Sequence, residues 1–399
     1  MAKTPVALVK VHPQAVASTI LNKVRETINL LGGVENFCDK NNTVLLKPNI
    51  SSSGALYCTN PSVTWAVAKT FSEYGCKVLI GDDPSIPTKE EIAYTEYSLY
   101  ALADQAKAKV VSLRYGPHSK AKVPGGGFFS EIQLSSFAIE ADLVVSVAAM
   151  KSINITTVSL GLKNMKGLVK SSWKRKFHSG NLNQGIVDLN KIVKQRLTVI
   201  DATFGKDTSA RVCYPVGLLI ASRDPVAADA VCTRIMGFDP EKIEHIRFAQ
   251  ETGLGTLDME NIDIVGERIE NWTGKFCFSP PKNPFKLVKK AGGKIKIIQG
   301  NPCSACLNEL GESLALWENQ LEDFKDLIIL VGPKAKPHVS CRHVILFGNC
   351  LKKYKDKGVY VAGCPPTEYG PAKTDSLKKV LTKILDKRER NRIDLAKDS

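Results

Sequence analysis

The stretch TVLLKPNI at residues 43–50 and the stretch KVLIGD at 77–82 decide the fold, because a helix signal stands between them. Asn60 is a typical helix N-cap and Pro61 is favoured in the first helical turn, so they predict a helix over 61–74. Two short apolar, β-branched strands joined by a helix form a βαβ unit, whose strands run parallel. This segment therefore predicts an α/β fold.

The alternation of strands and helices continues on both sides of this unit. Further strands are predicted at 5–10, 109–113, 141–148, 197–203 and 216–222, and further helices at 14–31 and 226–237. Strands that alternate with helices are typical of a sheet covered by helices on its faces. We therefore expect residues 1–272 to form one α/β domain with a mostly parallel sheet and flanking helices.

A change in composition separates this region from the rest of the chain. Residues 273–293 contain many prolines, glycines and lysines, which predicts a linker. Beyond it, shorter elements are predicted: strands at 294–298, 327–331, 343–347 and 358–362, and helices near 308–321 and 374–390. They predict a smaller C-terminal α/β domain over 294–372, followed by a basic C-terminal helix and tail over 373–399.

The charge of the chain favours an anionic partner. Among the 399 residues, 55 Lys and Arg exceed 40 Asp and Glu, which gives a formal net charge of +15. Nucleic acid, an acidic redox protein and a phosphate-bearing substrate all satisfy this charge. The basic runs lack the regularly spaced aromatic residues of a single-strand stacking platform, so nucleic acid is an alternative rather than the favoured partner.

The beginning of the chain indicates the compartment. The stretch MAKTPVALVKVHPQ at 1–14 breaks its apolar run within a few residues, unlike a signal peptide, and no later stretch is apolar enough to span a membrane. We therefore expect a cytoplasmic protein without a membrane partner. Cytosolic thiols stay reduced, so clustered cysteines in such a protein indicate metal binding or catalysis more often than disulfides.

The cysteines of the C-terminal quarter form the clearest chemical signal. Three motifs, GNPCSACLNELG at 300–311, LFGNCLKK at 346–353 and YVAGCPP at 360–366, each follow a predicted strand. A C-x-x-C pair and two further loops bring four thiolates to one edge, and an iron–sulfur cluster needs four such ligands. The motifs therefore predict a [4Fe-4S] cluster in the smaller domain. Its four ligands are Cys303, Cys306, Cys350 and Cys364.

Two other interpretations of these cysteines stay open. Four thiolates also form a closed structural zinc site, although such sites more often use two C-x-x-C knuckles. A redox-active disulfide between Cys303 and Cys306 is the second alternative, but it gives Cys350 and Cys364 no role. An iron–sulfur cluster uses all three motifs, so zinc is the less favoured cofactor.

The order of the three motifs is itself informative. C-x-x-C, then G-x-C, then GCPP resembles the cluster-binding pattern of the small subunit of nickel–iron hydrogenases and the related subunit of respiratory complex I. The resemblance covers residues 300–366 and implies a single [4Fe-4S] cluster. It assigns Cys303 and Cys306 to the first loop, Cys350 to the second and Cys364 to the third. Cys341 matches no position, so it is either a core thiol, which we favour, or an alternative fourth ligand.

Polar residues stand at the downstream ends of the predicted strands in the first domain. They are Lys47, Asn49, Asp82, Asp83, Lys151, Asn154, Asp201 and Asp224. In open α/β sheets this edge is where ligands bind, so we expect a polar cleft there. Each residue taken alone could instead be a helix cap or a turn former.

Seven motifs are spread over the first 270 residues: VLLKPNI at 44–50, TNPSV at 59–63, VLIGDDP at 78–84, ADLVVSVAAMK at 141–151, GLKNMKGLV at 161–169, IASRDPVAADAV at 220–231 and MGFDPEKIEHIRFAQETGLG at 236–255. Together they resemble the prokaryotic family known as domain of unknown function 362. The resemblance implies no agreed reaction. It does allow a cysteine cluster, because members of this family often carry ferredoxin-like or other clusters.

One motif departs from the family pattern. The family's usual lysine-x-lysine-threonine-histidine after the fifth strand is MKSIN at 150–154 here, so a proton-transferring or metal-binding histidine is absent at that point. Lys151 remains as a candidate for contacting an anion. Lys163, Asn164 and Lys166 follow on a predicted helix and could present further donors together with Lys47. The alternative is that these lysines are ordinary surface residues of an amphipathic helix.

The first domain thus predicts a set of candidate functional residues. The candidate catalytic residues are Lys151 and His178, and His178 stands in the polar stretch KFHSGNLNQG at 176–185. An imidazole is suited to acid–base chemistry near neutral pH, although an exposed loop histidine is the alternative. The candidate substrate-binding residues are Lys47, Asn49, Asp82, Asp83, Lys163 and Asn164.

These features together predict an iron–sulfur protein that acts as a redox enzyme or an electron-transfer protein. A small anionic substrate would bind at the strand ends of the first domain, and the [4Fe-4S] cluster would pass or receive electrons. An acidic redox protein is the other expected partner. The alternative function is a nucleic-acid-associated basic protein in which a cluster or a zinc ion is structural.

Overall fold

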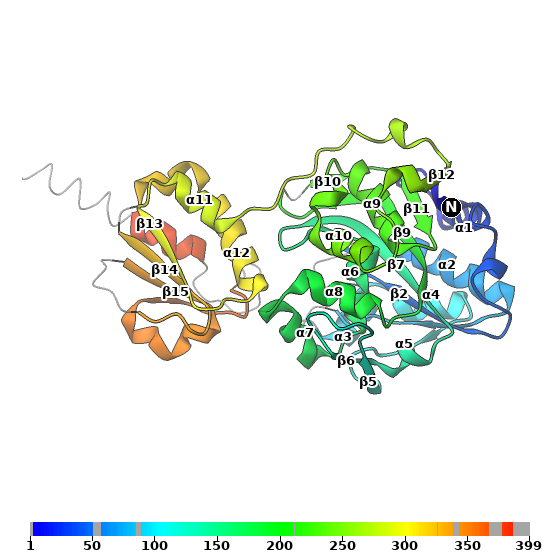
Figure 1. Cartoon of the computed structure of the whole chain (residues 1–399), viewed down its shortest axis with the longest axis horizontal. Helices are drawn as coiled ribbons and strands as arrows, with labels where there is room; N and C mark the ends of the chain where they lie inside the picture. Colours follow the sequence, from blue (N-terminus) through cyan, green and yellow to red (C-terminus); the bar gives the residue numbers. More distant parts are fainter. Residues whose placement is uncertain are drawn as a thin grey trace, which may run out of the picture. The chain divides into compact units, whose positions relative to one another are not determined.

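The computed structural model describes residues 3–50, 57–84, 89–210, 212–324, 326–337, 343–366 and 377–385. By its contacts the chain divides into two compact units. The larger unit comprises Met1–Phe177 and Asn181–Ser279, and the smaller unit comprises His178–Gly180 and Pro280–Ser399. Figure 1 shows both units with their helices and strands labelled.

A mostly parallel sheet forms the centre of the larger unit. Within the described residues its strands are β1 (Thr4–Lys10), β2 (Thr43–Pro48), β3 (Lys77–Ile80), β4 (Lys109–Val110), β7 (Leu143–Ile153), β8 (Thr157–Ser159), β9 (Gln195–Asp207), β10 (Val212–Tyr214), β11 (Leu218–Ser222) and β12 (Ile262–Gly266). Their order is β12-β1-β11-β9-β7-β2-β3-β4, with β10 beside β9 and β8 beside β7, and Figure 1 shows β11, β9 and β7 side by side.

The pairing of these strands confirms the predicted fold class. Neighbours pair parallel from β9 through β7, β2 and β3 to β4, and β12 pairs parallel with β1. Only β11 interrupts this direction along the path, because it runs antiparallel to both β1 and β9. The carboxyl ends of β2, β3, β7 and β9 therefore meet at one edge of the sheet.

Helices cover both faces of this sheet. Successive side chains of a strand point to opposite faces, so Val44 and Leu46 join one hydrophobic core while Leu45 joins the other. The first core includes residues of α1 (Ala17–Asn29), α2 (Pro61–Tyr74), α3 (Glu90–Glu96) and α4 (Leu99–Gln105). The second includes residues of α6 (Gly161–Asn164), α8 (Leu182–Asn190), α9 (Pro225–Ile235) and α10 (Glu244–Glu251).

Local capping chemistry fixes the best-predicted helix. The helix predicted over 61–74 is observed with the same bounds as α2, and Asn60 Oδ1 accepts a hydrogen bond from Ser62 N at 3.0 Å. The helices predicted over 14–31 and 226–237 are observed as the shorter α1 and α9. The sequence did not predict β8, β10, β12, or the hairpin of β5 (His118–Lys122) and β6 (Glu131–Ser135).

The smaller unit contains an entirely parallel sheet. In the part of the chain that is described, its strands in spatial order are β13 (Ile295–Gln299), β14 (Leu327–Val331), β15 (His343–Phe347) and β16 (Val359–Val361). Helix α12 (Ser304–Ala315) begins earlier than the helix predicted near 308–321. Neither unit has, within the described ranges, a helix long and apolar enough to cross a membrane.

The segment predicted as a linker contains a helix. Helix α11 (Pro284–Lys290) lies inside the range 273–293, and Asn283 Oδ1 caps it by accepting hydrogen bonds from two backbone amides. Leu287 is 5% exposed and packs in the core of the smaller unit. The later part of the predicted linker therefore forms a capped helix that packs with the smaller unit.

Candidate functional site

A buried ion pair lies at the strand ends of the larger unit. Lys47 stands near the end of β2 and Asp82 follows β3, and Lys47 Nζ lies 2.7 Å from Asp82 Oδ1. The two side chains are 1% and 3% exposed. Burial lowers the pKa of Lys47, whereas the charge of Asp82 acts in the opposite direction and favours the ammonium form. We call the polar residues around this pair the strand-end site. They are Lys47, Asn49, Asp82, Asp83, Arg114, Lys151, Lys163, Asn164, Lys166, Lys174, Asp201 and Lys206.

Asn164 connects this pair to helix α6. Its Oδ1 accepts a hydrogen bond from Lys47 Nζ at 2.9 Å, and its Nδ2 donates to the backbone oxygen of Lys47 at 2.7 Å. Nδ2 also donates to Ser146 Oγ of β7 at 3.0 Å. The structure therefore brings together three of the predicted substrate-binding residues, Lys47, Asp82 and Asn164, by direct contacts.

The N-terminus of α6 is already occupied by a carboxylate. Asp229 of α9 accepts hydrogen bonds from the amides of Gly161 at 2.7 Å and Leu162 at 3.0 Å. Complete burial raises the pKa of Asp229 to about 7, although the two amides act to lower it. Because Asp229 holds these amides, side chains rather than this helix end must bind any anion here.

Asp83 forms a second buried group beside the first. Arg114 Nε lies 2.6 Å from Asp83 Oδ1, and Lys174 Nζ lies 2.6 Å from Oδ2. Ser171 Oγ donates to Oδ2 at 2.8 Å. The sequence pointed to Asp83 but not to Arg114, Ser171 or Lys174, which come from a loop and from helix α7 (Ser171–Ser179). One carboxylate here faces two cations.

Two lysines face each other on neighbouring strands. Lys151 of β7 and Lys206 of β9 are register partners in the parallel pairing of these strands. Lys206 Nζ lies 3.8 Å from Asp201 Oδ2, whereas Lys151 Nζ donates to the uncharged oxygens of Asn49 at 2.6 Å and Tyr57 at 3.4 Å. Burial and the charge of Lys206 lower the pKa of Lys151 to about 8.

Lys163 and Lys166 complete the strand-end site. Both side chains are half-buried, one on α6 and the other on the 3-10 turn Met165–Leu168 that follows it. Burial and the charge of Lys174 lower the pKa of Lys166 to about 7. Burial also lowers the pKa of Lys163 well below its ordinary value, and the charges of Lys166 and Lys151 add to this effect. These lysines thus form one electrostatic group with Lys151.

Two further predicted residues have other surroundings. His178 is half-buried near the end of α7, and its contacts group it with the smaller unit rather than with the strand-end site. Asp224 is a helix cap, because its Oδ1 accepts hydrogen bonds from the amides of Val226 and Ala227 at the start of α9. Its position at a strand end is therefore explained by capping alone.

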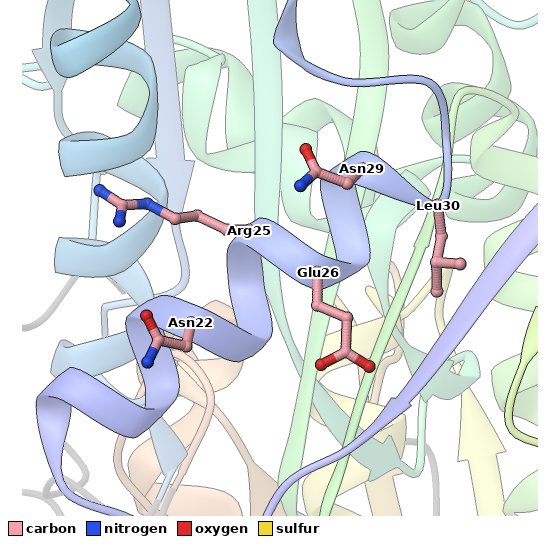
Figure 2. A pocket seen from close by; sticks show the side chains of 5 residues that line it. All are labelled: Asn22, Arg25, Glu26, Asn29 and Leu30. Atoms are coloured by element: carbon pink, nitrogen blue, oxygen red, sulfur yellow. The ribbon is translucent and has the colours of Figure 1, made fainter.

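A surface pocket lies away from all the predicted residues in the sequence. Figure 2 shows its lining on and just after α1: Asn22, Arg25, Glu26, Asn29 and Leu30. Arg25 forms an ion pair with Glu73 of α2 there. None of these side chains belongs to the strand-end site, so the pocket adds nothing to its chemistry.

The four predicted cluster ligands lie at the carboxyl ends of strands in the smaller unit. Cys303 and Cys306 follow β13 at the start of α12, Cys350 follows β15, and Cys364 follows β16. A hydrogen bond with Cys306 lowers the pKa of Cys303 to about 6. That bond, burial and the charges of Cys303, Cys364 and Cys350 raise the pKa of Cys306. The other three cysteines are therefore all near enough to Cys306 to act on its ionisation.

The donor set has the chemistry of a cluster site. Within the described ranges, no three His, Cys, Asp or Glu side chains are placed so that they could hold a metal ion as they stand. Gly348, however, has a φ of +101°, and a Cβ there would lie 3.4 Å from Cys306 Sγ. Four thiols are the number of ligands that an iron–sulfur cluster requires. Cys341 lies outside the described residues.

Two comparisons place the chain beside known proteins. It is 28% identical to the thylakoid-associated protein sll1697 of Synechocystis sp. over 256 residues, which cover 61% of this chain and 78% of that protein. The lactate racemase apoprotein from Thermoanaerobacterium thermosaccharolyticum aligns with 82% of this chain and 69% of its own, at 12% identity. The TM-score of that alignment is 0.37, which is too low to carry a functional argument.

The larger unit also matches a protein family. All residues of the strand-end site fall within one continuous segment of the chain. That segment, residues 44–234, matches the model of the family described as Domain of unknown function (DUF362).

Proposed function

We propose that this chain is an iron–sulfur protein whose smaller unit binds one [4Fe-4S] cluster and whose larger unit binds a small anionic substrate at the strand-end site. The cluster ligands are Cys303, Cys306, Cys350 and Cys364. One observation carries the proposal: loops after three strands of one parallel sheet hold four cysteines, and the charges of the other three all act to raise the pKa of Cys306. Such a set can supply the four thiolates that a cluster of this kind requires.

The ionisation of Cys303 supports metal binding by this group. A thiol must lose its proton to become a ligand, and the pKa of Cys303 is lowered to about 6. Cys303 is also the N-cap residue of α12, so the positive end of a helix faces its thiolate. The first ligand is therefore available as a thiolate at neutral pH.

The number of thiols favours electron transfer over Lewis-acid chemistry. A cluster held by four thiolates has no open iron for substrate, so its contribution is to accept or donate an electron. The larger unit would then bind the anion that is oxidised or reduced. The net charge of +15 also suits an acidic redox protein as the electron donor or acceptor.

The experiment is metal and acid-labile sulfide analysis of the full chain purified without oxygen. We expect about four irons and four sulfides per chain, and a brown colour that bleaches with dithionite. Cys303→Ser and Cys364→Ser should lose most of the iron. Cys277→Ser is the matched control, because Cys277 is an exposed cysteine of the larger unit.

Two outcomes separate the alternatives. One zinc per chain in place of iron would show that the four thiols form a structural zinc site, and would overturn the proposal. If Cys341→Ser lost iron while Cys350→Ser kept it, the fourth ligand would be Cys341 and the proposed set would be wrong at Cys350. A colourless chain without iron or zinc after anaerobic purification and reconstitution would also contradict it.

A further inference from the structure

The strand-end site contains more positive than negative groups. Its carboxylates are each engaged by a cation: Asp82 by Lys47, Asp83 by both Arg114 and Lys174, and Asp201 by Lys206. Lys151 and Lys163 are left outside these pairs. Among the residues that the structure describes, Lys163 Nζ has no hydrogen bond or ion pair, and Lys151 Nζ bonds only to uncharged oxygens.

The position of Lys151 makes the excess of positive charge in the strand-end site unfavourable in free energy. It is the register partner of Lys206, and like charges directly opposite each other on neighbouring strands repel. Lys206 is 4% exposed, so solvent does not screen the pair well. A protein can accommodate two such ammonium groups by losing a proton or by binding an anion between them.

Two other buried carboxylates near these lysines are engaged by hydrogen bonds. Asp207, which follows Lys206 on β9, accepts hydrogen bonds from Ser152 Oγ and from three backbone amides. Asp229, the other carboxylate beside α6, is turned to the amides of Gly161 and Leu162. In the described part of the chain, neither Asp207 nor Asp229 forms an ion pair with Lys151 or Lys163, so a bound anion can supply the counter-charge of these lysines.

We infer that the ligand of the strand-end site is a small oxyanion with at least two negative charges, bound by Lys151, Lys163 and Lys166. This inference rests on the proposed function and specifies its substrate class. A single negative charge would neutralise only one of the lysines that lie outside the ion pairs. A phosphate-type group and a dicarboxylate share the required chemistry, because both present several oxygens and two charges to ammonium donors.

The inference predicts that protons accompany the ligand. In the free protein the pKa values of Lys166 and Lys151 are lowered to about 7 and about 8, and the pKa of Lys163 is lowered well below its ordinary value. A bound dianion favours the ammonium form of each lysine, so these groups take up protons at pH 8. The charged and titratable groups that face them are Lys47, Cys58, Asp82, Lys174, Lys206 and His245.

The test is titration calorimetry of the full chain at pH 8 with sulfate and, separately, malonate, because both are dianions at that pH. Chloride and acetate at equal ionic strength are the monoanion controls. Repeating each titration in two buffers with different ionisation enthalpies gives the number of protons bound. We expect saturable binding of at least one dianion with net proton uptake. Tighter binding of sulfate would indicate a phosphate-type ligand, and tighter binding of malonate would indicate a dicarboxylate.

A matched pair of variants locates the binding. Lys163→Gln should weaken dianion binding about tenfold or more, because it removes a charge-assisted hydrogen bond from a half-buried site. Lys242→Gln removes a lysine whose side chain is 83% exposed and should leave binding unchanged. Dianions that bind no better than chloride, or bind without proton uptake, would overturn the inference. Iron and sulfide content in the same samples tests the proposed cluster separately.

Discussion

Cys38 Sγ lies 3.3 Å from Cys76 Sγ, and both thiols are buried in the larger unit. The packing of the segment after α1 against the residue before β3 brings these two cysteines together. Burial raises the pKa of both thiols, so the pair is stable as thiols at neutral pH.

We expect this pair to form a disulfide when a small disulfide such as oxidised glutathione supplies the oxidant. The exchange reduces the reagent to two thiols as Cys38 and Cys76 lose two protons and two electrons, and it accelerates as pH rises because thiolate attacks. Closing a loop of this length should stabilise the unit by roughly 3–4 kcal/mol. Peptide mapping and urea unfolding check both effects, and Cys76→Ser is the control that should gain neither.

The buried pair of Lys47 and Asp82 should be essential for stability. Lys47→Met leaves the Asp82 carboxylate buried without its cation, which costs about 3–5 kcal/mol of unfolding free energy. Urea unfolding measures this loss. Lys69→Met is the matched control, because its pair with Glu73 is partly exposed and its loss should change stability by less than about 1 kcal/mol. If both variants lost the same unfolding free energy, burial would not explain the importance of the pair of Lys47 and Asp82.

Asp229 should make the stability of the larger unit depend on pH. Its folded pKa is raised to about 7, above the value of about 4 for an unfolded aspartate, so the folded state holds the proton more tightly. The contribution of Asp229 to the free energy of unfolding is therefore greatest below pH 4, and it falls as the pH rises to 7. At roughly 1.4 kcal/mol per pH unit the loss amounts to a few kcal/mol.

Asp229→Asn should remove this dependence. The stability of wild type relative to the variant, measured by urea unfolding, should decline by a few kcal/mol between pH 4 and pH 8. Asp263→Asn, which changes an exposed aspartate of β12, serves as the control and should show no such trend. A constant difference between wild type and Asp229→Asn across this range would show that Asp229 stays ionised in the folded state.

The sequence predicted those parts of the fold that local chemistry determines. Asn60 and Pro61 define the start of α2 by themselves, so the helix over 61–74 was predicted with its observed bounds. Strand β12 was missed because its short sequence gains stability from pairing with β1, which is more than 200 residues away in the chain. The antiparallel direction of β11 likewise depends on a connection that no local pattern reveals.

The strand-end site was predictable only in part for the same reason. Polar residues that follow strands pointed to Lys47, Asp82 and Asp83, because the edge of a parallel sheet brings such positions together. Arg114 and Lys174 carry no comparable signal. Their role depends on how a loop and helix α7 pack around Asp83, and that packing is a property of the tertiary structure.

The glycine before Cys350 gives a test of the cluster that leaves every thiol in place. Gly348→Ala puts a methyl group 3.4 Å from the sulfur of Cys306, one of the proposed ligands. It also adds backbone strain of about 1 kcal/mol, because φ is +101°. We expect iron content after anaerobic reconstitution to fall about twofold or more, with all four cysteines still open to alkylation after unfolding.

Gly292 separates backbone strain from loss of space. It lies in the same unit with a φ of +62°, and a Cβ there would meet no atom within 4 Å. Gly292→Ala should therefore lose a similar amount of thermal stability while retaining its iron. If both variants lost iron equally, strain alone would explain the effect of Gly348→Ala, and the space beside Cys306 would no longer support a cluster between the three loops.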